Sequence, residues 1–328
     1  MSKAAVIHEF GPPEVFRIQD LDVGNPKLGE VRLRQTAIGV NFADVRQRAG
    51  ESYNFPLDEL PIVLGREGAG MVEEVGADVE DLSVGDRVAY GMGGWGGYAE
   101  TRLVPADRLV RLPDTVDDVT AVAVMVRGMT AWYLVCRAYA VQNGDWILLH
   151  AAAGGVGLIL AQWAKHLGAT VIGTVGSAEK AEIARSYGCD HTINYRTDPI
   201  AETVRELTGG KGVVAVYDSV GKDTFEASLD SLGVLGHFIM FGAASGDVDP
   251  IDPVRLMQKG SIHFTRTSMR HYTRTRSDLE VGTGALFRSI ASDDIKVKVN
   301  RFEGLENLAA AHRALEARQL TGSTVVVL

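Results

Sequence analysis

The stretch from Asp145 to Lys180 constrains the fold of this chain more than any other segment; it reads DWILLHAAAGGVGLILAQWAKHLGATVIGTVGSAEK. An apolar run at 146–150 ends in a turn of small residues at 151–157, and an apolar helical stretch then continues to about residue 167. A second run, rich in β-branched residues, follows at 170–174. A strand, a tight turn, a helix and a second strand in this order predict one βαβ unit.

The turn of this unit carries a variant of the glycine fingerprint that binds dinucleotides. The fingerprint positions of G-x-G-x-x-G hold Ala152, Gly154 and Gly157, so alanine replaces the first glycine. The middle glycine lets the backbone approach a pyrophosphate, the last lets the helix pack on the strand, and the helix N-terminus offers N–H donors and a positive dipole end. We therefore expect a cofactor to bind at these three residues and at Gly155 and Val156 between them. Two alternatives stay open at this point: a glycine turn that only packs a crossover helix, and a methyltransferase site.

Composition limits the remaining classes of protein. At 328 residues the chain is long for one core and natural for two domains. The formal net charge is −9 and no run approaches the ~18 apolar residues of a membrane span, so neither nucleic acid nor a membrane is an expected partner. The N-terminus lacks the long apolar core of a secretory signal, and the two cysteines, Cys136 and Cys189, indicate no disulfide framework. We expect a cytoplasmic enzyme.

The pattern of elements predicts two α/β domains of different kinds. Strands and helices alternate in the middle of the chain, which predicts a doubly wound parallel sheet at 126–266, with 261–267 as its last strand. In the N-terminal part, short strands separated by glycines predict a small β-rich domain. A helix and a strand near the C-terminus are expected to return to this domain, which then comprises 1–125 and 267–328.

Two features stand out in the N-terminal part. Asn41 follows a predicted strand at 30–38, and Asp44 comes three residues later, which is a pattern typical of a helix cap. The loop 91–97 is the most glycine-dense in the chain and carries Trp95. A hairpin connection explains these glycines without any ligand, and the mobile wall of a pocket is the alternative.

Taken together, the motifs resemble those of medium-chain dehydrogenases/reductases, and within them the zeta-crystallin-like quinone oxidoreductases. The resemblance runs from Ala4 to the C-terminus. It rests on GVNFADVRQRAG (39–50), GDRVAY (85–90), HAAAGGVGLILAQWAKHLGA (150–169), IGTVGSAEKA (172–181), INYR (193–196) and YDSVG (217–221). It implies a GroES-like catalytic domain, built from both ends of the chain, around a Rossmann domain. It also implies that NADPH delivers hydride to a quinone or a related conjugated acceptor, generally without metal.

Zinc is not expected. Zinc-dependent relatives place Gly-His-Glu where this chain has Gly65-Arg66-Glu67, and arginine cannot ligate zinc. With two cysteines in the whole chain, a structural four-cysteine lobe is impossible as well.

The end of the second strand of the βαβ unit favours NADPH over NADH. An NAD-specific site presents Asp or Glu there for the ribose hydroxyls, whereas this strand ends GTVGS (173–177) without an acid. Lys180 follows, and a 2′-phosphate needs such a cation and no competing carboxylate. The alternative is that Ser177 only caps the next helix and that Lys180 is only a solvated side chain. The missing acid also argues against a methyltransferase.

The resemblance assigns further residues to the cofactor. Ser177, Lys180 and Tyr195 match residues that surround the adenosine phosphate in such reductases, and Arg318 matches an arginine that approaches the same phosphate. Gly176 and Ser219 complete the set of candidate cofactor-binding residues on this side.

Hydride transfer to a quinone needs an exposed nicotinamide face, a flat apolar slot and donors for the acceptor oxygen, but no nucleophile. The resemblance places Asn41 and Thr130 against the nicotinamide and the substrate, and Arg266 on the nicotinamide side. Asp44 is expected to order the local backbone rather than to transfer protons.

Arg46 departs from relatives that carry an aromatic residue at this position. We count it among the catalytic candidates because a guanidinium can stack on a quinone or pair with an anionic group. A solvated surface arginine is the alternative. Tyr53 is nearby in sequence and is interpreted as an exposed loop residue.

These patterns predict an NADPH-dependent, zinc-free quinone reductase that acts on a small molecule. The alternatives are an NADPH-dependent reductase of conjugated C=C bonds on the same scaffold, and a nucleotide-binding protein without physiological turnover. The segment 261–265 alternates in the position of the last sheet strand, so its edge predicts a homodimer. A proline at Ile262 is expected to weaken that dimer.

Overall fold

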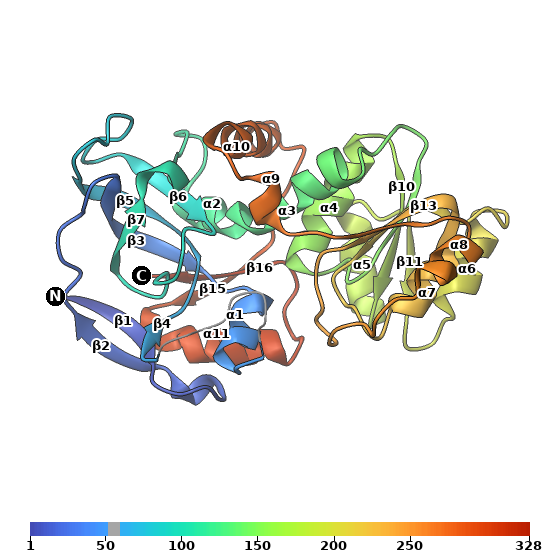
Figure 1. The fold of residues 1–328 in the computed structure, drawn as a ribbon, viewed down its shortest axis with the longest axis horizontal. Coiled ribbons are helices and arrows are strands. Elements are labelled where there is room, and N and C mark those ends of the chain that lie inside the picture. Colours follow the sequence, from blue (N-terminus) through green and yellow to red (C-terminus); the bar gives the residue numbers. More distant parts are fainter. Residues whose placement is uncertain (52–59) are drawn as a thin grey trace. The chain divides into compact units, whose positions relative to one another are not determined.

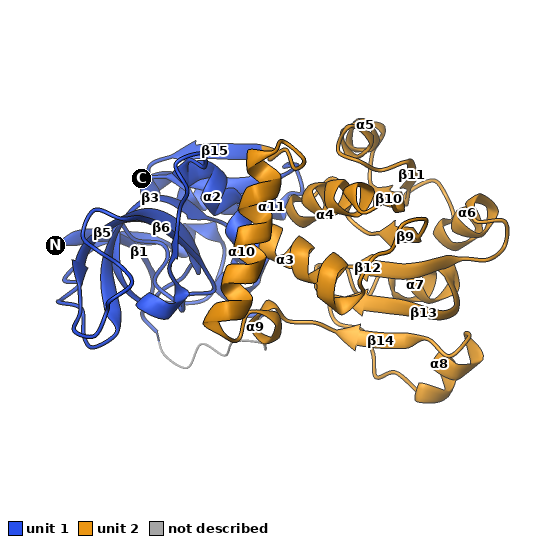
Figure 2. Cartoon of the chain, turned by 90° about the horizontal axis from the view of Figure 1, so that it is seen from above, with its two compact units in different colours: residues 1–126, 299–328 blue, residues 127–298 orange. Residues whose placement is uncertain are grey.

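The computed structural model describes residues 1–51 and 60–328, and these form two compact units (Figures 1 and 2). Unit 1 comprises Met1–Val126 and Val299–Leu328, and unit 2 comprises Arg127–Lys298. Within the described ranges, no single helix is long and apolar enough to cross a bilayer.

Unit 2 contains a six-stranded, all-parallel sheet in the order β11-β10-β9-β12-β13-β14. Its strands are β9 (Trp146–Leu149), β10 (Thr170–Val175), β11 (His191–Asn194), β12 (Val213–Asp218), β13 (Leu232–Met240) and β14 (His263–Arg266). The strand order reverses between β9 and β12, and ligands of such sheets bind at the carboxyl ends of the strands at this switch point. This topology is that of the predicted doubly wound sheet.

The helices of unit 2 include the crossovers between these strands. They are α3 (Arg127–Tyr133), α4 (Gly155–His166), α5 (Ala178–Ser186), α6 (Ile200–Leu207), α7 (Phe225–Ser231), α8 (Pro253–Gln258), α9 (Met269–Tyr272) and α10 (Arg276–Ala291), and a π-helical turn, η3 (Leu134–Ala138), follows α3. The strands are apolar because both faces of the sheet are covered. Leu148, Ile172, Val216 and Phe238 are aligned across the sheet and are buried in one cluster on one face. The next residues on three of these strands point to the other face and are buried too; they are Leu149, Tyr217 and Ile239.

The second boundary between the units falls after Lys298, whereas the sequence places the domain boundary after residue 266. The intervening helices belong with unit 2 because they pack on α3. Tyr272 of α9 stacks on Tyr133 of α3 with 4.4 Å between the ring centroids, and the Tyr133 hydroxyl lies 3.1 Å from Thr267 Oγ1.

Unit 1 is β-rich and contains both ends of the chain (Figure 2). A three-stranded sheet has the order β2-β1-β4, and a seven-stranded sheet has the path β15-β16-β3-β5-β6-β8 with β7 paired to β3. Its elements are β1 (Ser2–Ile7), η1 (Pro13–Val15), β2 (Arg17–Leu21), β3 (Glu30–Gly39), α1 (Phe42–Arg48), β4 (Ile62–Val63), β5 (Glu67–Val75), β6 (Arg87–Gly91), β7 (Thr101–Pro105), η2 (Ala106–Arg108), β8 (Val110–Arg111), α2 (Asp118–Met125), β15 (Val299–Glu303), η4 (Leu305–Asn307), α11 (Leu308–Glu316) and β16 (Ser323–Val327).

The pairing of β16 with β3 closes the seven-stranded sheet from the two ends of the sequence. It is antiparallel, with Val326 opposite Ile38 and Val325 opposite Gly39. Both Val326 and Ile38 are fully buried in the same apolar cluster. The C-terminal strand β16 therefore belongs to the same unit as the N-terminal segment.

Candidate active site

The turn after β9 is tightly built. Ala151 has a φ of 53°, a left-handed conformation that side chains rarely adopt, and its carbonyl accepts the N–H of Gly154 at 2.9 Å. A Cβ on Gly157 would lie 2.5 Å from the Ala151 oxygen, so only glycine lets α4 begin this close to the turn. The packing role expected of Gly157 is confirmed.

The alanine in place of the first fingerprint glycine has a structural counterpart. Ala152 is fully buried, and a Cβ on Gly173 of β10 would lie 2.7 Å from the Ala152 methyl group. The missing side chain at Gly173 therefore makes the room that Ala152 fills.

The N-terminus of α4 is suited to an anion. Gly154 is the N-cap, no side chain of the described residues caps it, and the first turn carries no acid. The first N–H groups of an α-helix lack intrahelical acceptors and carry the positive end of the helix dipole. Residues 154–157 thus have the geometry that holds a pyrophosphate in dinucleotide sites.

Four of the predicted cofactor residues come together after β10. Ser177 Oγ accepts the Lys180 N–H at 3.2 Å, which confirms Ser177 as the cap of α5. A Cβ on Gly176 would lie 2.5 Å from the Tyr195 hydroxyl, so the Tyr195 ring packs directly on Gly176. Tyr195 is 42% exposed. Lys180 thus lies in the first turn of α5 beside this corner, and β10 ends without an acid.

Ser219 follows β12 at the same edge of the sheet. Its carbonyl accepts the Ala244 N–H at 3.1 Å, and a Cβ on Gly242 would lie 2.5 Å from that carbonyl oxygen. The loops that follow β12 and β13 are therefore packed against each other.

Thr130 and Arg266 lie on neighbouring parts of unit 2. Arg266 ends β14, and its Nη1 lies 3.4 Å from the Met240 carbonyl oxygen and 3.3 Å from that of Thr267. Thr130 of α3 is buried, and its Oγ1 lies 3.9 Å from Met269 Sδ. The segment 266–269 thus connects the two predicted nicotinamide residues of unit 2.

In unit 1, the Asn41 side chain is held by a buried carboxylate. Asn41 Nδ2 donates to Glu67 Oε2 at 2.8 Å, and the Val126 N–H donates to Glu67 Oε1 at 2.5 Å. Glu67 is fully buried. The sequence signals Glu67 only through its place after Gly65-Arg66, so its contact with Asn41 was not predicted.

Asp44 orders the backbone as expected. Its Oδ2 accepts the Asn41 N–H at 2.9 Å and the Tyr98 hydroxyl at 3.1 Å. Its Oδ1 lies 3.8 Å from Arg66 Nε, and the Arg66 guanidinium lies 5.0 Å from the Trp95 ring centroid. A guanidinium thus occupies the histidine position of zinc-dependent relatives. In the part of the chain that the structure describes, no group of three or more His, Cys, Asp or Glu residues could hold a metal ion.

The remaining predicted residues of the N- and C-terminal segments lie elsewhere in unit 1. Arg46 Nη2 donates to the Glu51 carbonyl at 3.2 Å, and its side chain is 19% exposed. Arg318 is exposed just after α11 and has a φ of 55°. Tyr53 lies outside the described residues. Asn41, Arg46 and Arg318 belong to unit 1 and the other predicted site residues to unit 2.

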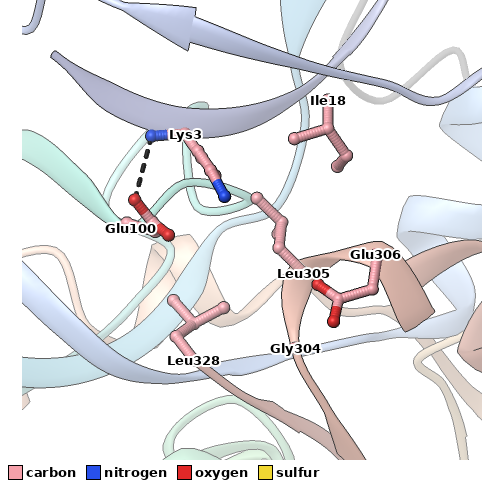
Figure 3. A pocket seen from close by; sticks show the side chains of 7 residues that line it. All are labelled: Lys3, Ile18, Glu100, Gly304, Leu305, Glu306 and Leu328. Carbon is pink, nitrogen blue, oxygen red and sulfur yellow. Dashed lines mark hydrogen bonds between the residues drawn. The ribbon is translucent and has the colours of Figure 1, made fainter.

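Unit 1 also has a surface hollow with a volume of about 420 Å³ (Figure 3). The Lys3 N–H donates to Glu100 Oε2 at 3.0 Å beside it. The described residues that line it share no member with the predicted site; they are Lys3, Ile18, Glu100, Gly304, Leu305, Glu306 and Leu328.

A parallel dinucleotide-type sheet and a β-rich unit closed by both chain ends define the class of medium-chain dehydrogenases/reductases. Residues 27–114 match the alcohol dehydrogenase GroES-like domain, and residues 155–281 match the family described as zinc-binding dehydrogenase. The chain is 48% identical to a 2-haloacrylate reductase of a Burkholderia species, covering 100% of this chain and 99% of that protein. It is 45% identical to a quinone oxidoreductase of Pseudomonas aeruginosa, covering 100% of both.

Comparison with solved structures indicates the same family. Escherichia coli quinone oxidoreductase complexed with NADPH matches with a TM-score of 0.96 and 40% identity, covering 99% of this chain and 100% of that chain. The protein belongs to the quinone oxidoreductase family.

Proposed function

We propose that the protein is an NADPH-dependent oxidoreductase that transfers hydride to a quinone without a metal. The observation that carries this proposal is the corner after β10, where Lys180, Ser177 and the Gly176–Tyr195 contact surround a strand end without an acid. The Escherichia coli relative was solved with NADPH, which supports the same cofactor here.

Most of the predicted residues then have a binding or orienting role. The N-terminus of α4 and the 154–157 backbone hold the pyrophosphate. Lys180 and Tyr195, together with Arg318, hold the 2′-phosphate. Thr130, Arg266 and Asn41 orient the nicotinamide and the acceptor. NADPH supplies the hydride, and no side chain serves as a nucleophile.

The test is a steady-state assay of NADPH oxidation with a panel of quinones. We expect turnover with NADPH, a much higher KM with NADH, and no loss after treatment with a chelator. A stoichiometric zinc ion removed together with activity would contradict the metal-free reaction.

A reductase of conjugated C=C bonds is the second candidate, because a relative of 48% identity is a 2-haloacrylate reductase. That substrate is an anion, and Arg46 offers a permanent positive charge. Arg46→Tyr should keep turnover and lower kcat/KM most for anionic acceptors, by about tenfold. Arg34→Tyr, at a largely exposed side chain of β3, is the control. An unchanged ratio between neutral and sulfonated quinones would remove Arg46 from acceptor selection, and loss of all turnover would make it essential.

Pairing of two copies through β14 completes the proposal. β14 is the last strand of the sheet (Figure 2). Its residues are mostly exposed. Such an edge is a template for a second copy of itself. We also propose a cytoplasmic location.

A further inference from the structure

We propose that Asp218 sets the affinity for NADPH by positioning the loops of unit 2 that surround the cofactor, without touching it. The inference rests on the proposed function. Asp218 is the last residue of β12, next to the point where the strand order reverses.

The Asp218 carboxylate accepts four hydrogen bonds although it is fully buried. Its Oδ1 accepts the N–H groups of Val220 at 2.7 Å and Gly221 at 3.0 Å. Its Oδ2 accepts the hydroxyls of Thr224 at 2.7 Å and Ser228 at 2.9 Å. The first two bonds fold the chain back around Ser219, a predicted cofactor residue, as an Asx-type turn.

A directed chain of hydrogen bonds leads from Asp218 to the fingerprint turn. A carboxylate only accepts, so Ser228 donates to it and receives the Nε2–H of His150, which lies 2.9 Å from Ser228 Oγ. His150 Nδ1 then accepts the Thr174 hydroxyl at 3.0 Å. Burial lowers the pKa of His150, in keeping with this neutral tautomer. Ser228 stands between the histidine and the acid, so the trio is not a nucleophilic triad.

This chain of hydrogen bonds joins the carboxyl ends of three strands. His150 directly precedes the turn 151–157 after β9. Thr174 lies at the end of β10, and its carbonyl accepts the Ala152 N–H at 3.0 Å. Asp218 begins the loop after β12. These are the loops that carry the fingerprint, the 2′-phosphate corner and Ser219, so one buried charge fixes their spacing.

A displacement of the turn after Asp218 would also displace the loop after β13, because hydrogen bonds connect the two. The Ser245 N–H donates to the Val220 carbonyl at 2.8 Å, and the Lys222 N–H donates to the Gly246 carbonyl at 3.1 Å. A Cβ on Gly221 would lie 2.6 Å from the Gly246 oxygen. A buried network with every member satisfied is rigid in this way, and one lost acceptor leaves its donors unpaired.

The test measures NADPH binding to the full chain by fluorescence titration. Asp218→Asn should raise the dissociation constant about tenfold, because an NH2 group replaces an oxygen that accepts two hydrogen bonds. Ser228→Ala should raise it about threefold, because it removes one bond to the carboxylate. The kcat at saturating NADPH should change by a smaller factor than the dissociation constant. The preference for NADPH over NADH should stay constant, because Lys180 is unchanged. Asp223→Asn makes the same chemical change at an exposed position nearby and should bind as the wild type does.

A purely structural role gives a different pattern. It lowers the melting temperature of Asp218→Asn and Ser228→Ala while leaving their NADPH dissociation constants unchanged, and that result overturns the inference. If Asp218→Asn does not fold, Ser228→Ala decides, because it leaves Asp218 three of its four partners. A wild-type protein that fails to bind NADPH contradicts the proposed function itself, whereas wild-type binding with unaltered variants contradicts this inference alone.

Discussion

Glu67 holds the Asn41 amide in one orientation, because both oxygens of its carboxylate accept hydrogen bonds. A glutamine at this position has one acceptor and one donor, so one of the two contacts would become donor against donor. We predict that Glu67→Gln lowers kcat about tenfold, since a buried unpaired donor costs about 1–3 kcal/mol. Steady-state kinetics at saturating NADPH check this.

Glu73→Gln is the matched control, because Glu73 lies on the same strand and is exposed. It loses only surface pairs with Arg32 and Arg34, which contribute at most about 1 kcal/mol. Wild-type kcat in Glu67→Gln would show that the orientation of Asn41 does not matter for the reaction.

Lys180 gives the sharpest test of cofactor choice. We predict that Lys180→Ala raises the KM for NADPH ten- to a hundredfold while the KM for NADH changes little, because a charge-assisted bond contributes about 1.5–3 kcal/mol. Lys211→Ala removes an exposed lysine elsewhere in unit 2 and is the control. Equal effects on both cofactors would mean that Lys180 does not bind the 2′-phosphate.

Residues whose partners are close in sequence were predictable, and those with distant partners were not. The Ser177 cap involves a residue three positions away, so spacing alone indicates it. The Asn41–Glu67 contact joins residues 26 positions apart, and the His150–Ser228 contact joins residues 78 apart. Such pairs arise from strand pairing and helix packing, which a motif does not record.

Among the elements, the edge strand β14 allows a direct test of the proposed dimer. Thr265 is exposed on β14, and a lysine on an edge strand disfavours pairing with a second copy. We predict that Thr265→Lys shifts sedimenting species from dimer to monomer at micromolar concentration. Lys259→Thr is the control, because Lys259 is exposed and lies between α8 and β14. A wild-type protein that sediments as a monomer contradicts the pairing.

The proline test expected from the sequence is not specific. The Ile262 N–H donates to the Leu256 carbonyl at 3.1 Å, and the Ile262 side chain is buried in the core cluster of unit 2. A proline there would disturb the fold of the unit as well as any interface, so the side-chain change at Thr265 replaces it.

Strong apolar periodicity identified most elements. The apolar pattern of the sequence predicts a strand at 191–194 and a helix at 200–207, and these match β11 and α6. The helix α8 was missed because none of its residues is buried, and β15 because it has no fully buried residue. Without a buried face a segment shows no hydrophobic pattern. The sequence also predicts a strand at 237–241, whereas β13 begins at Leu232. It includes Leu235 with a φ of 61°, an irregular stretch that alternation does not reveal.

For the whole molecule, we expect the free energy of unfolding to decrease as the pH is lowered, because His312 is buried. Burial, with the nearby Arg48 guanidinium, lowers the pKa of His312 to about 3. The unfolded chain binds a proton near pH 6.5, so below that pH the unfolded state gains a proton that the folded state does not, until about pH 3. The contribution of His312 to the free energy of unfolding is therefore fully present above pH 6.5 and decreases by roughly 1.4 kcal/mol per pH unit between pH 6.5 and about pH 3.

His312→Gln removes this contribution. We predict a shallower dependence of the urea midpoint between pH 7 and pH 5 in this variant, whatever its stability at pH 7. His271→Gln, at an exposed position, should keep the wild-type slope. The same slope in His312→Gln as in the wild type would show that His312 is not the group that titrates.

The pairing of β3 with β16 has a consequence for the order in which the chain folds as it leaves the ribosome. Unit 2 is one continuous stretch, so all of its strands are available once residue 298 has emerged. The seven-stranded sheet of unit 1 cannot be completed at that point, because residues 37–39 of β3 pair with residues 325–327 of β16. Throughout that interval the nascent chain carries an unfilled place beside β3, and an unfilled strand edge pairs readily with the wrong segment or with another chain.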